Sequence, residues 1–519
     1  MAQIYGQAHL VIAWLGKPAE DTRLAFRLLE VFAALSSEPD GVVEGSEAQR
    51  HLLILEELVQ ELCLDHPFQV FADLTNAAWR GAFALVERPW FTRLWVVQEV
   101  ALSSNLSIRC GKFDTSGDAF CSALRIISMI AFFPPSLDVM NDFNRVLQLT
   151  NLRRSIMAGN SQSFLHLAHR LSRWNCTDDR DRLNALVSVA FKGNPLPWFS
   201  PNYRTDVGGA YQIFAESYIS ATGNLDILHF AGDSRTVIVR TADGLQIYNV
   251  PYMDDELSVA ATWSPDWRIK TRPLPFHSEN SVNDSLAFSA THSAADFQLD
   301  SSRRILRVRV LLVDEMKVVG LPLLPDLPAI EDSTFKIEGI LNIWFALARS
   351  VCGRDAEGDQ GEDWMHRFAM TLIADGRTAA APSPGMPRTR AQQIERFRCW
   401  AKRLLHVSDQ EEDCSEDRLH HYFIPISEGI SDACTYGYEA VEVCKYRNFF
   451  VTKNGRFGLG PAQTRPGSPI YLIHGLKTPF VLEKASEETC YHLRGECYVD
   501  GLMYGAIRES DMDTNIDLL

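Results

Sequence analysis

The feature that most constrains the fold of this chain is the tryptophan-rich stretch at residues 88–102. Pro89 suits the first position of a helix, where its missing N–H costs nothing. At about 100° per residue, apolar side chains then occupy most of the helix circumference. Two adjacent stripes hold Trp90, Leu94, Val97 and Ala101, and Phe91, Trp95 and Leu102. The spacing therefore predicts a buried helix over this stretch.

A narrow polar strip on this helix contains the carboxyl group of Glu99, and that group needs an explanation. Thr92 and Ser103 share the strip, and Gln98 precedes Glu99 in the chain. Ionised carboxylates are rarely buried without a partner. Glu99 therefore faces solvent, pairs with a base or points into a cleft. Structural glutamates outnumber catalytic ones, so the pattern alone favours a solvated or ion-paired side chain.

Length and charge indicate a soluble protein with several domains. The 519 residues are too many for one hydrophobic core, which predicts about two to four domains. Apolar residues make up 46% of the chain and charged residues 22%, as in ordinary globular proteins. The net charge of −16 argues against nucleic acid or an anionic membrane as a partner, because both need clustered positive charge.

The cysteines and apolar runs indicate a reducing, cytoplasmic location. The eleven cysteines are scattered and none forms a Cys-x-x-Cys pair, so we expect free thiols and no metal site. The apolar residues 8–15 follow no positively charged segment, so a buried strand is favoured over a signal peptide. No run is long enough to predict a membrane span.

The pattern along the chain predicts an α+β protein. An α/β domain opens it, a mainly helical middle region follows, and a small antiparallel β region closes it. In the last of these, Asn454-Gly455 between two apolar runs is a strong hairpin signal. The expected regions are 1–111, the helical 112–230, the mixed 231–345, the helical 346–445 with a mobile loop near 377–390, and a sheet or barrel at 446–519.

Two further motifs favour structural roles. The glycines at positions 455, 458 and 460 do not open a helix, so they predict tight β-turns and not a phosphate-binding loop. His166 and His169 share a helix face, but a metal site would need more ligands. An ordinary surface or core pair is therefore expected.

An acidic cluster and a tryptophan pair leave alternatives open. Asp178, Asp179 and Asp181 precede an apolar helical run, where acids favour the helix start; cation binding is the alternative. Trp263 and Trp267 could line a pocket, although a core or interface position is favoured.

Residues 88–102, followed by Cys110-Gly111, resemble the signature of the fungal heterokaryon incompatibility (HET) domain. Ile4–Ala8 leading to Trp14-Leu15-Gly16 is similar to the segment that precedes it in the family. Other segments that resemble family members are 179–190, 201–203, 263–267, 371–375, 458–461 and 495–503. The resemblance implies a fungal protein of non-self recognition, in which the domain triggers growth arrest or programmed cell death. It also implies protein partners, either a second copy of the chain or an incompatibility partner.

The HET domain is in turn regarded as distantly TIR-like, with a flavodoxin-like parallel sheet. Some TIR domains, which belong to innate immunity, cleave NAD with a glutamate on a Trp-Cys-x-x-Glu-Leu-like helix. Residues 95–100 look like its counterpart. The resemblance thus implies Glu99 as the catalytic residue, with Trp95 and Gln98 as candidate ligand-binding residues and NAD as a substrate. No resident cofactor is predicted. The resemblance lies at the level of fold, which does not itself establish an activity.

One departure from the family concerns the N-terminus. Family members carry an earlier segment, including a strand that ends in Asp-x-x-Cys-Ile-Asn-Gln, and Met1 here lies after the equivalent position. The chain is thus N-terminally truncated relative to the family, either because its true start lies upstream of Met1 or because it is a degenerate copy. A sheet without its first strands should expose apolar edge surface. A non-enzymatic, self-associating signalling module and an inactive remnant are the two alternatives to an NAD-cleaving enzyme.

Overall fold

The computed structural model describes residues 2–35, 45–130, 137–191, 196–232, 235–241, 244–250, 261–270, 272–276, 288–291, 294–324, 337–351, 359–376, 389–406, 430–485, 489–505 and 514–519. Two compact units account for the chain. The first comprises Met1–Leu196 with Glu416–Pro425, and the second Pro197–Ser415 with Ile426–Leu519. Residues 377–388, where a mobile loop is predicted, lie outside the described residues.

A small mixed sheet lies in the first unit. Its strands are β1 (Val11–Trp14), β2 (Leu106–Cys110) and β3 (Phe113–Ser116), in the order β1-β2-β3. Strands β1 and β2 are parallel, with Val11 opposite Leu106, and β3 returns antiparallel to β2. The expected parallel sheet is thus represented by one parallel pair. Alternate side chains of β1 are buried, while Ile12 and Trp14 remain 45% and 53% exposed.

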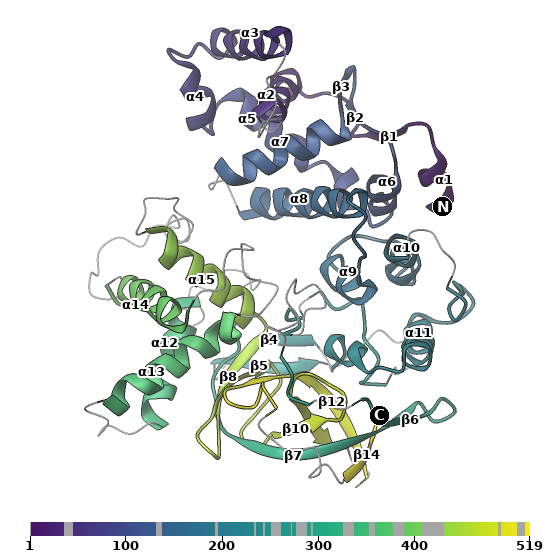
Figure 1. Ribbon diagram of the computed structural model, residues 1–519, viewed down its shortest axis with the longest axis vertical. Helices are drawn as coiled ribbons and strands as arrows, with labels where there is room; N and C mark the ends of the chain where they lie inside the picture. Colours follow the sequence, from purple (N-terminus) through teal and green to yellow (C-terminus); the bar gives the residue numbers. More distant parts are fainter. Residues whose placement is uncertain are drawn as a thin grey trace. The chain divides into compact units, whose positions relative to one another are not determined.

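Most helices of the first unit lie to the left of this sheet and below it in the view of Figure 1. The helices are α1 (Ala2–Gln7), α2 (Thr22–Leu35), α3 (Gly45–Glu61), α4 (Pro67–Ala72), α5 (Ala77–Val86), α6 (Val96–Leu102), α7 (Gly117–Ile130), α8 (Leu137–Met157), α9 (Phe164–Arg170) and α10 (Asp181–Ala190). Helix α2 packs against α5 and α7, while α6 packs against α1, α8 and α10. At Gly81 a Cβ atom would lie 2.4 Å from the Asp21 carbonyl oxygen, so glycine permits the close approach of α5 to the start of α2.

The single helix predicted over residues 88–102 is wrong in one respect, because the chain is broken in its middle. A 3₁₀ turn, η1 (Pro89–Thr92), begins at Pro89 as expected, but Arg93 is extended with φ −80° and ψ 131°. The Leu94 amide donates to the Asn175 carbonyl at 2.8 Å, and the Asn175 amide donates to the Thr92 carbonyl at 2.7 Å. This backbone pairing with a distant segment overrides the local helical period, so the α-helix itself spans only Val96–Leu102.

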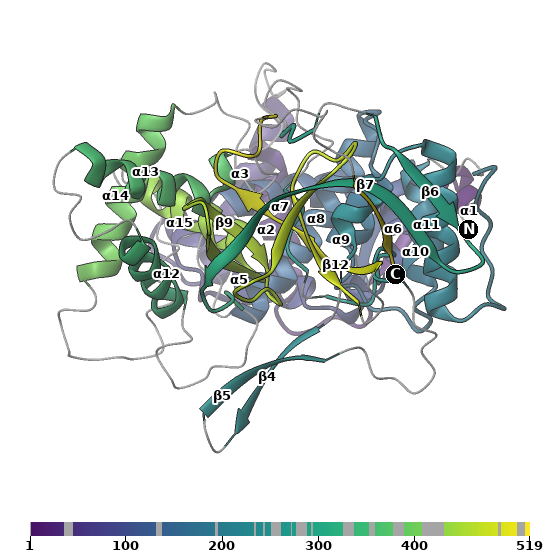
Figure 2. The same ribbon diagram turned by 90° about the horizontal axis from the view of Figure 1, so that it is seen from below.

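The second unit contains a closed β-barrel. Its strands are β7 (Ile305–Val319), β10 (Pro469–Ile473), β11 (Phe480–Lys484), β12 (Cys490–Glu496) and β14 (Thr514–Leu518). Strand β7 pairs with both β10 and β14, which closes the path β7-β10-β11-β12-β14 into a ring. Figure 2 shows the long β7 curving across the barrel. The pairs are antiparallel except β12 with β14, and β7 comes from outside the predicted range 446–519.

Further strands extend from β7. They are β6 (Phe297–Asp300), β8 (Arg447–Thr452), β9 (Phe457–Pro461) and β13 (Tyr498–Val499), while β4 (Arg235–Thr241) and β5 (Gly244–Val250) pair only with each other within the described residues. Strands β8 and β9 form the predicted hairpin, with Gly455 at φ +73° in its turn. Gly458 and Gly460 lie within β9, and a Cβ atom at Gly458 would meet the Phe450 ring at 2.2 Å. Close ring packing explains Gly458, so the prediction of tight turns is confirmed at Gly455 alone.

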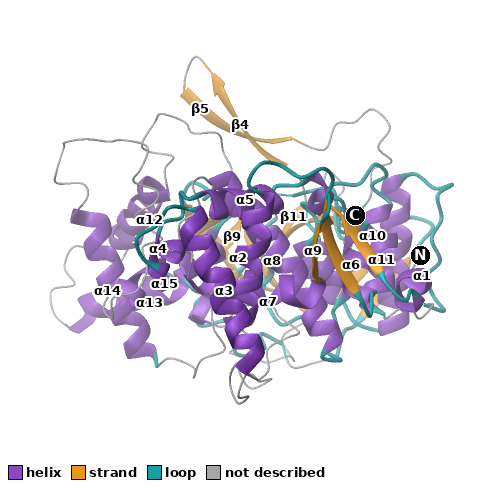
Figure 3. Ribbon diagram, turned by 90° about the horizontal axis from the view of Figure 1, so that it is seen from above, coloured by secondary structure: helices purple, strands orange, loops and turns teal. Residues whose placement is uncertain are grey.

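The helices of this unit are α11 (Val207–Thr222), η2 (Asp226–Phe230), α12 (Ile337–Val351), α13 (Asp359–Leu372), η5 (Ala374–Gly376), α14 (Arg390–His406) and α15 (Ile430–Cys444). Helices α12 to α15 form a group beside the strands (Figures 1 and 3). Trp344 and Phe368 pack their rings against Phe449 of β8, which joins the helices and the strands in one hydrophobic core. The predicted α+β class is confirmed.

Candidate functional site

Glu99 lies in the first turn of α6 with its side chain half-buried. Burial raises the pKa of the Glu99 carboxyl above its ordinary value, and the positive charge of Arg93 opposes part of that shift. Within the described residues no hydrogen bond or ion pair reaches this carboxyl. Of the three alternatives that the sequence leaves open, pairing with a base is therefore not what the structure shows.

Tyr5 and Arg93 are the charged or ionisable neighbours of Glu99. Tyr5 belongs to α1, which packs along α6. Burial and, after it, the negative charge of Glu99 raise the pKa of Tyr5, whereas Arg93 acts in the opposite direction. Three groups of complementary chemistry, a carboxyl, a phenol and a guanidinium, thus face the same region.

Trp95 is the residue immediately before α6, four positions ahead of Glu99. Trp95 precedes the helix as its N-cap residue and has helical backbone angles. The indole N–H donates to the Asp181 carboxylate at 3.0 Å, from the first turn of α10. This hydrogen bond restrains the half-buried indole of Trp95 against α10.

Gln98 points in a different direction from Glu99. It is 1% exposed, and its side-chain amide donates to the Ala185 carbonyl of α10 at 2.8 Å. The Gln98 Oε1 atom has no hydrogen-bond partner among the described residues. The structure therefore places Gln98 in the contact between α6 and α10, the helix that Trp95 also reaches through Asp181.

The other end of α6 is held by a buried arginine. The Arg153 guanidinium of α8 is bonded to the Val100 carbonyl at 2.8 Å, the Ser103 carbonyl at 2.6 Å and the Ser103 hydroxyl at 3.1 Å. The last carbonyls of a helix lack partners inside it and carry partial negative charge, which a cation satisfies. Arg153 thereby fixes the short helix that carries Glu99.

Comparison with known proteins gives matches to two family profiles and to a relative. The profile described as "Heterokaryon incompatibility protein (HET)" matches residues 1–99, and that described as "Het-6 beta-barrel domain" matches residues 387–518. Heterokaryon incompatibility protein 6, OR allele, of Neurospora crassa is 21% identical over 571 residues, covering 98% of this chain and 78% of the relative. The chain thus resembles heterokaryon incompatibility (HET) proteins in two separate ranges and, at low identity, over almost its whole length. No solved structure matches it.

The matched HET range contains Tyr5, Arg93, Trp95 and Glu99, and the barrel match contains every barrel strand except β7. In this chain the described residues include no helix that is both long and apolar enough to span a membrane. The two matched ranges therefore correspond to a site-bearing α/β portion and to the closed barrel.

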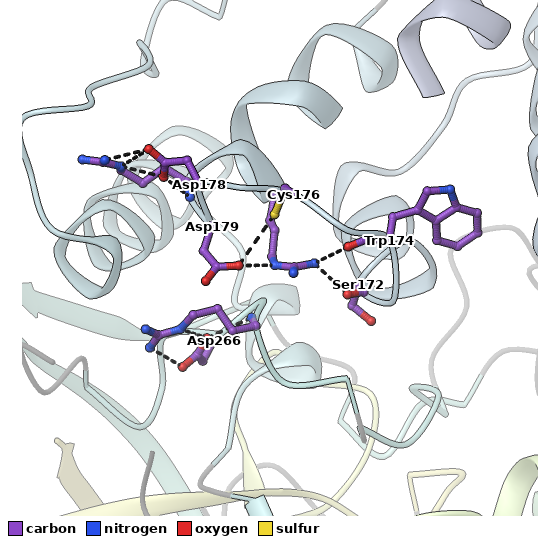
Figure 4. Close-up of polar contacts among 9 residues, drawn as sticks. Ser172, Trp174, Cys176, Asp178, Asp179 and Asp266 are labelled. Atoms are coloured by element: carbon purple, nitrogen blue, oxygen red, sulfur yellow. Dashed lines mark hydrogen bonds and ion pairs between the residues drawn. The ribbon is translucent and has the colours of Figure 1, made fainter. Parts of the chain in front are cut away.

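The acidic side chains at the start of α10 make structural contacts, as Figure 4 shows for Asp178 and Asp179. Asp179 accepts from Arg182 at 2.8 Å and from the Cys176 thiol at 3.6 Å. Arg182 also donates to the Ser172 carbonyl at 2.7 Å and is 6% exposed. No group of three or more metal-ligating side chains occurs in the part of the chain that the structure describes. The role of these acids is to build the start of α10.

The remaining sequence candidates are core residues. His166 is buried and its Nδ1 atom lies 3.3 Å from the Ser163 hydroxyl. Trp263 is fully buried, with its indole donating to the Arg304 carbonyl at 3.1 Å. Trp267 is also buried and packs against the Phe230 ring. The core position favoured for the tryptophan pair is what the structure shows.

A buried polar network in the second unit escaped the sequence analysis. Glu496 at the end of β12 lies 2.8 Å from His229 Nδ1 of η2 and 3.3 Å from the Arg447 guanidinium of β8. The Thr478 hydroxyl donates to the same carboxylate at 3.2 Å. All four side chains are buried, and their positions in the sequence give no periodic signal. The network joins η2, β8 and the barrel.

Proposed function

We propose that this protein, as a HET protein of a filamentous fungus, acts in non-self recognition and cell death signalling by cleaving NAD at its nicotinamide bond, with Glu99 as the catalytic carboxylate. The observation that carries the proposal is a half-buried carboxyl without a hydrogen bond among the described residues, four positions after an indole held by Asp181. A structural glutamate in such a place would normally be paired. Perturbed, unpaired groups of this kind concentrate at functional sites.

The chemistry follows from the charge of the group. As the bond between ribose C1′ and the pyridinium nitrogen breaks, its electron pair neutralises the pyridinium, and positive charge develops on the ribose. A carboxylate in partly desolvated surroundings stabilises that charge more strongly than one in water. Water then adds to C1′ and loses a proton to solvent, which gives nicotinamide and ADP-ribose. The Trp95 indole supplies a flat surface for the leaving ring.

Substitution of Glu99 tests this proposal. Purified E99Q should lose about 100-fold in kcat for NAD hydrolysis, because the amide cannot stabilise positive charge. E20Q, which removes an exposed glutamate in the same unit, should retain wild-type activity. E99Q should melt at the same or a slightly higher temperature, since burial penalises the ionised carboxyl.

Equal NAD loss by E99Q and the wild type would refute the assignment. Absence of NAD cleavage by the wild type, with cell death still triggered on expression, would instead favour a non-enzymatic self-associating module. The exposed Ile12 and Trp14 on β1 are the observation that supports this second candidate. A wild-type protein that neither cleaves NAD nor triggers cell death would indicate an inactive remnant.

The pH dependence gives an independent check on Glu99. The carboxylate is the active form, so activity falls as the pH drops through the pKa of Glu99. Because burial raises that pKa, the acid limb of the kcat/KM profile should have its midpoint above 4.5. R93Q removes the opposing positive charge and should move the midpoint further upward. A midpoint at or below 4.5 would contradict the structural environment of Glu99.

A further inference from the structure

We propose that Arg93 binds the phosphate of the ligand at the Glu99 site, which makes a phosphate-bearing nicotinamide nucleotide the preferred substrate class. The inference rests on the proposed function for the identity of the reaction, but ligand binding can be tested without turnover. Arg93 would act by positioning the ligand, and Glu99 would act on the ribose.

The backbone of Arg93 is unusually well fixed for an exposed residue. It lies between the two hydrogen bonds that join Thr92 and Leu94 to Asn175, in the break between η1 and α6. This extended residue interrupts what would otherwise be a continuous helix. The start of the Arg93 side chain is therefore held in place, while its guanidinium end extends into solvent.

The guanidinium of Arg93 makes no hydrogen bond or ion pair within the described part of the chain. Three other arginines of this unit do have such partners. Arg153 binds the end of α6, Arg180 binds Asp178, and Arg182 binds Asp179 and two carbonyls. Arg93 thus carries a cation on a fixed stretch of backbone, and no described residue pairs with that cation.

Its position relative to Glu99 suits a nucleotide. Arg93 stands two residues before Trp95 and Glu99 four residues after it, and the two charges influence each other without forming an ion pair. In a nicotinamide nucleotide the same ribose carries the ring on C1′ and the phosphate on C5′. A carboxylate under C1′ therefore needs a cation one ribose away. Guanidinium groups bind phosphate oxygens through paired, charge-assisted hydrogen bonds.

Binding of ADP-ribose, measured by calorimetry, tests the inference first. Wild-type protein should bind ADP-ribose, and R93Q should bind it about 10- to 100-fold more weakly, because a charge-assisted hydrogen bond is lost. R93K should recover part of the affinity, since lysine keeps the positive charge but lacks the paired N–H donors of the guanidinium group. R154Q, at an exposed arginine of α8, should bind like the wild type. Rising salt should weaken wild-type binding more than R93Q binding.

Turnover supplies the second test. Nicotinamide riboside has the same glycosidic bond as NAD and no phosphate. The ratio of kcat/KM for NAD to that for nicotinamide riboside should fall about tenfold or more in R93Q. An unchanged ratio, or no binding of ADP-ribose to the wild type, would overturn the inference. Arg93-dependent binding of ADP-ribose by a wild type that cleaves no NAD would support it while refuting the proposed reaction.

Discussion

Replacing Glu496 with alanine should destabilise the second unit by about 3–5 kcal/mol, the cost of leaving a buried cation without its counter-charge. The Glu496 carboxylate accepts from the Phe276 amide and from Thr478, and it lies between His229 and Arg447. Burial lowers the pKa of Arg447 to about 10, with Glu496 opposing that shift. Without Glu496, the hydrogen-bond acceptors that Arg447 keeps among the described residues are the Val443 and Leu274 carbonyls.

Urea denaturation, combined with hydrogen exchange of peptides from β11 and β12, measures this effect within the second unit. E496Q should lose less free energy of unfolding than E496A, because the glutamine amide retains one acceptor and fills the same volume. E315A removes an exposed glutamate paired with Lys453 at the barrel surface and should cost at most about 1 kcal/mol. Equal midpoints for E496A and E315A would show that the network contributes little to stability.

Much of the fold follows from local patterns. The apolar run at residues 8–15 predicted a strand where β1 lies, and Asn454-Gly455 predicted the hairpin of β8 and β9. The closure of the barrel could not be predicted in this way. It depends on β7 pairing with strands that follow it by more than 150 residues, as in the contact of Val310 with Ile473 and Thr514.

For the candidate site, too, local patterns predicted some features and missed those that depend on contacts between distant segments. Helical periodicity placed Glu99 on a polar strip, and in the structure Glu99 is half-buried on α6, four positions after Trp95. Gln98 is next to Glu99 in the sequence. Successive residues of a helix are turned by about 100°, however, and the Gln98 side chain points into the core. Tyr5 and Arg93 carried no signal, because their proximity depends on the packing of α1 and on the pairing with Asn175.

Loss of the Arg153 guanidinium should destabilise the first unit by about 3 kcal/mol, because R153M removes the donor that the buried Val100 and Ser103 carbonyls share. The Val100 carbonyl would keep only the weaker bond from the Ser103 hydroxyl, at 3.4 Å, among the described residues. The methionine keeps most of the aliphatic stem, so little of the loss arises from packing. For a unit of this size the melting temperature should fall by about 6–12 °C. Differential scanning calorimetry of R153M and wild-type protein measures this change.

The effect of Arg153 should come from its carbonyl contacts and not from its ion pair. Asp118, its charged partner at 3.3 Å, is 83% exposed, so D118N should change the melting temperature by little. R154Q alters the next residue of α8 and serves as the matched control. Because Arg153 fixes the end of α6, NAD cleavage in R153M should fall even below its melting temperature, as Glu99 loses its fixed position. An R153M protein that melts like R154Q would show that α6 does not depend on this contact.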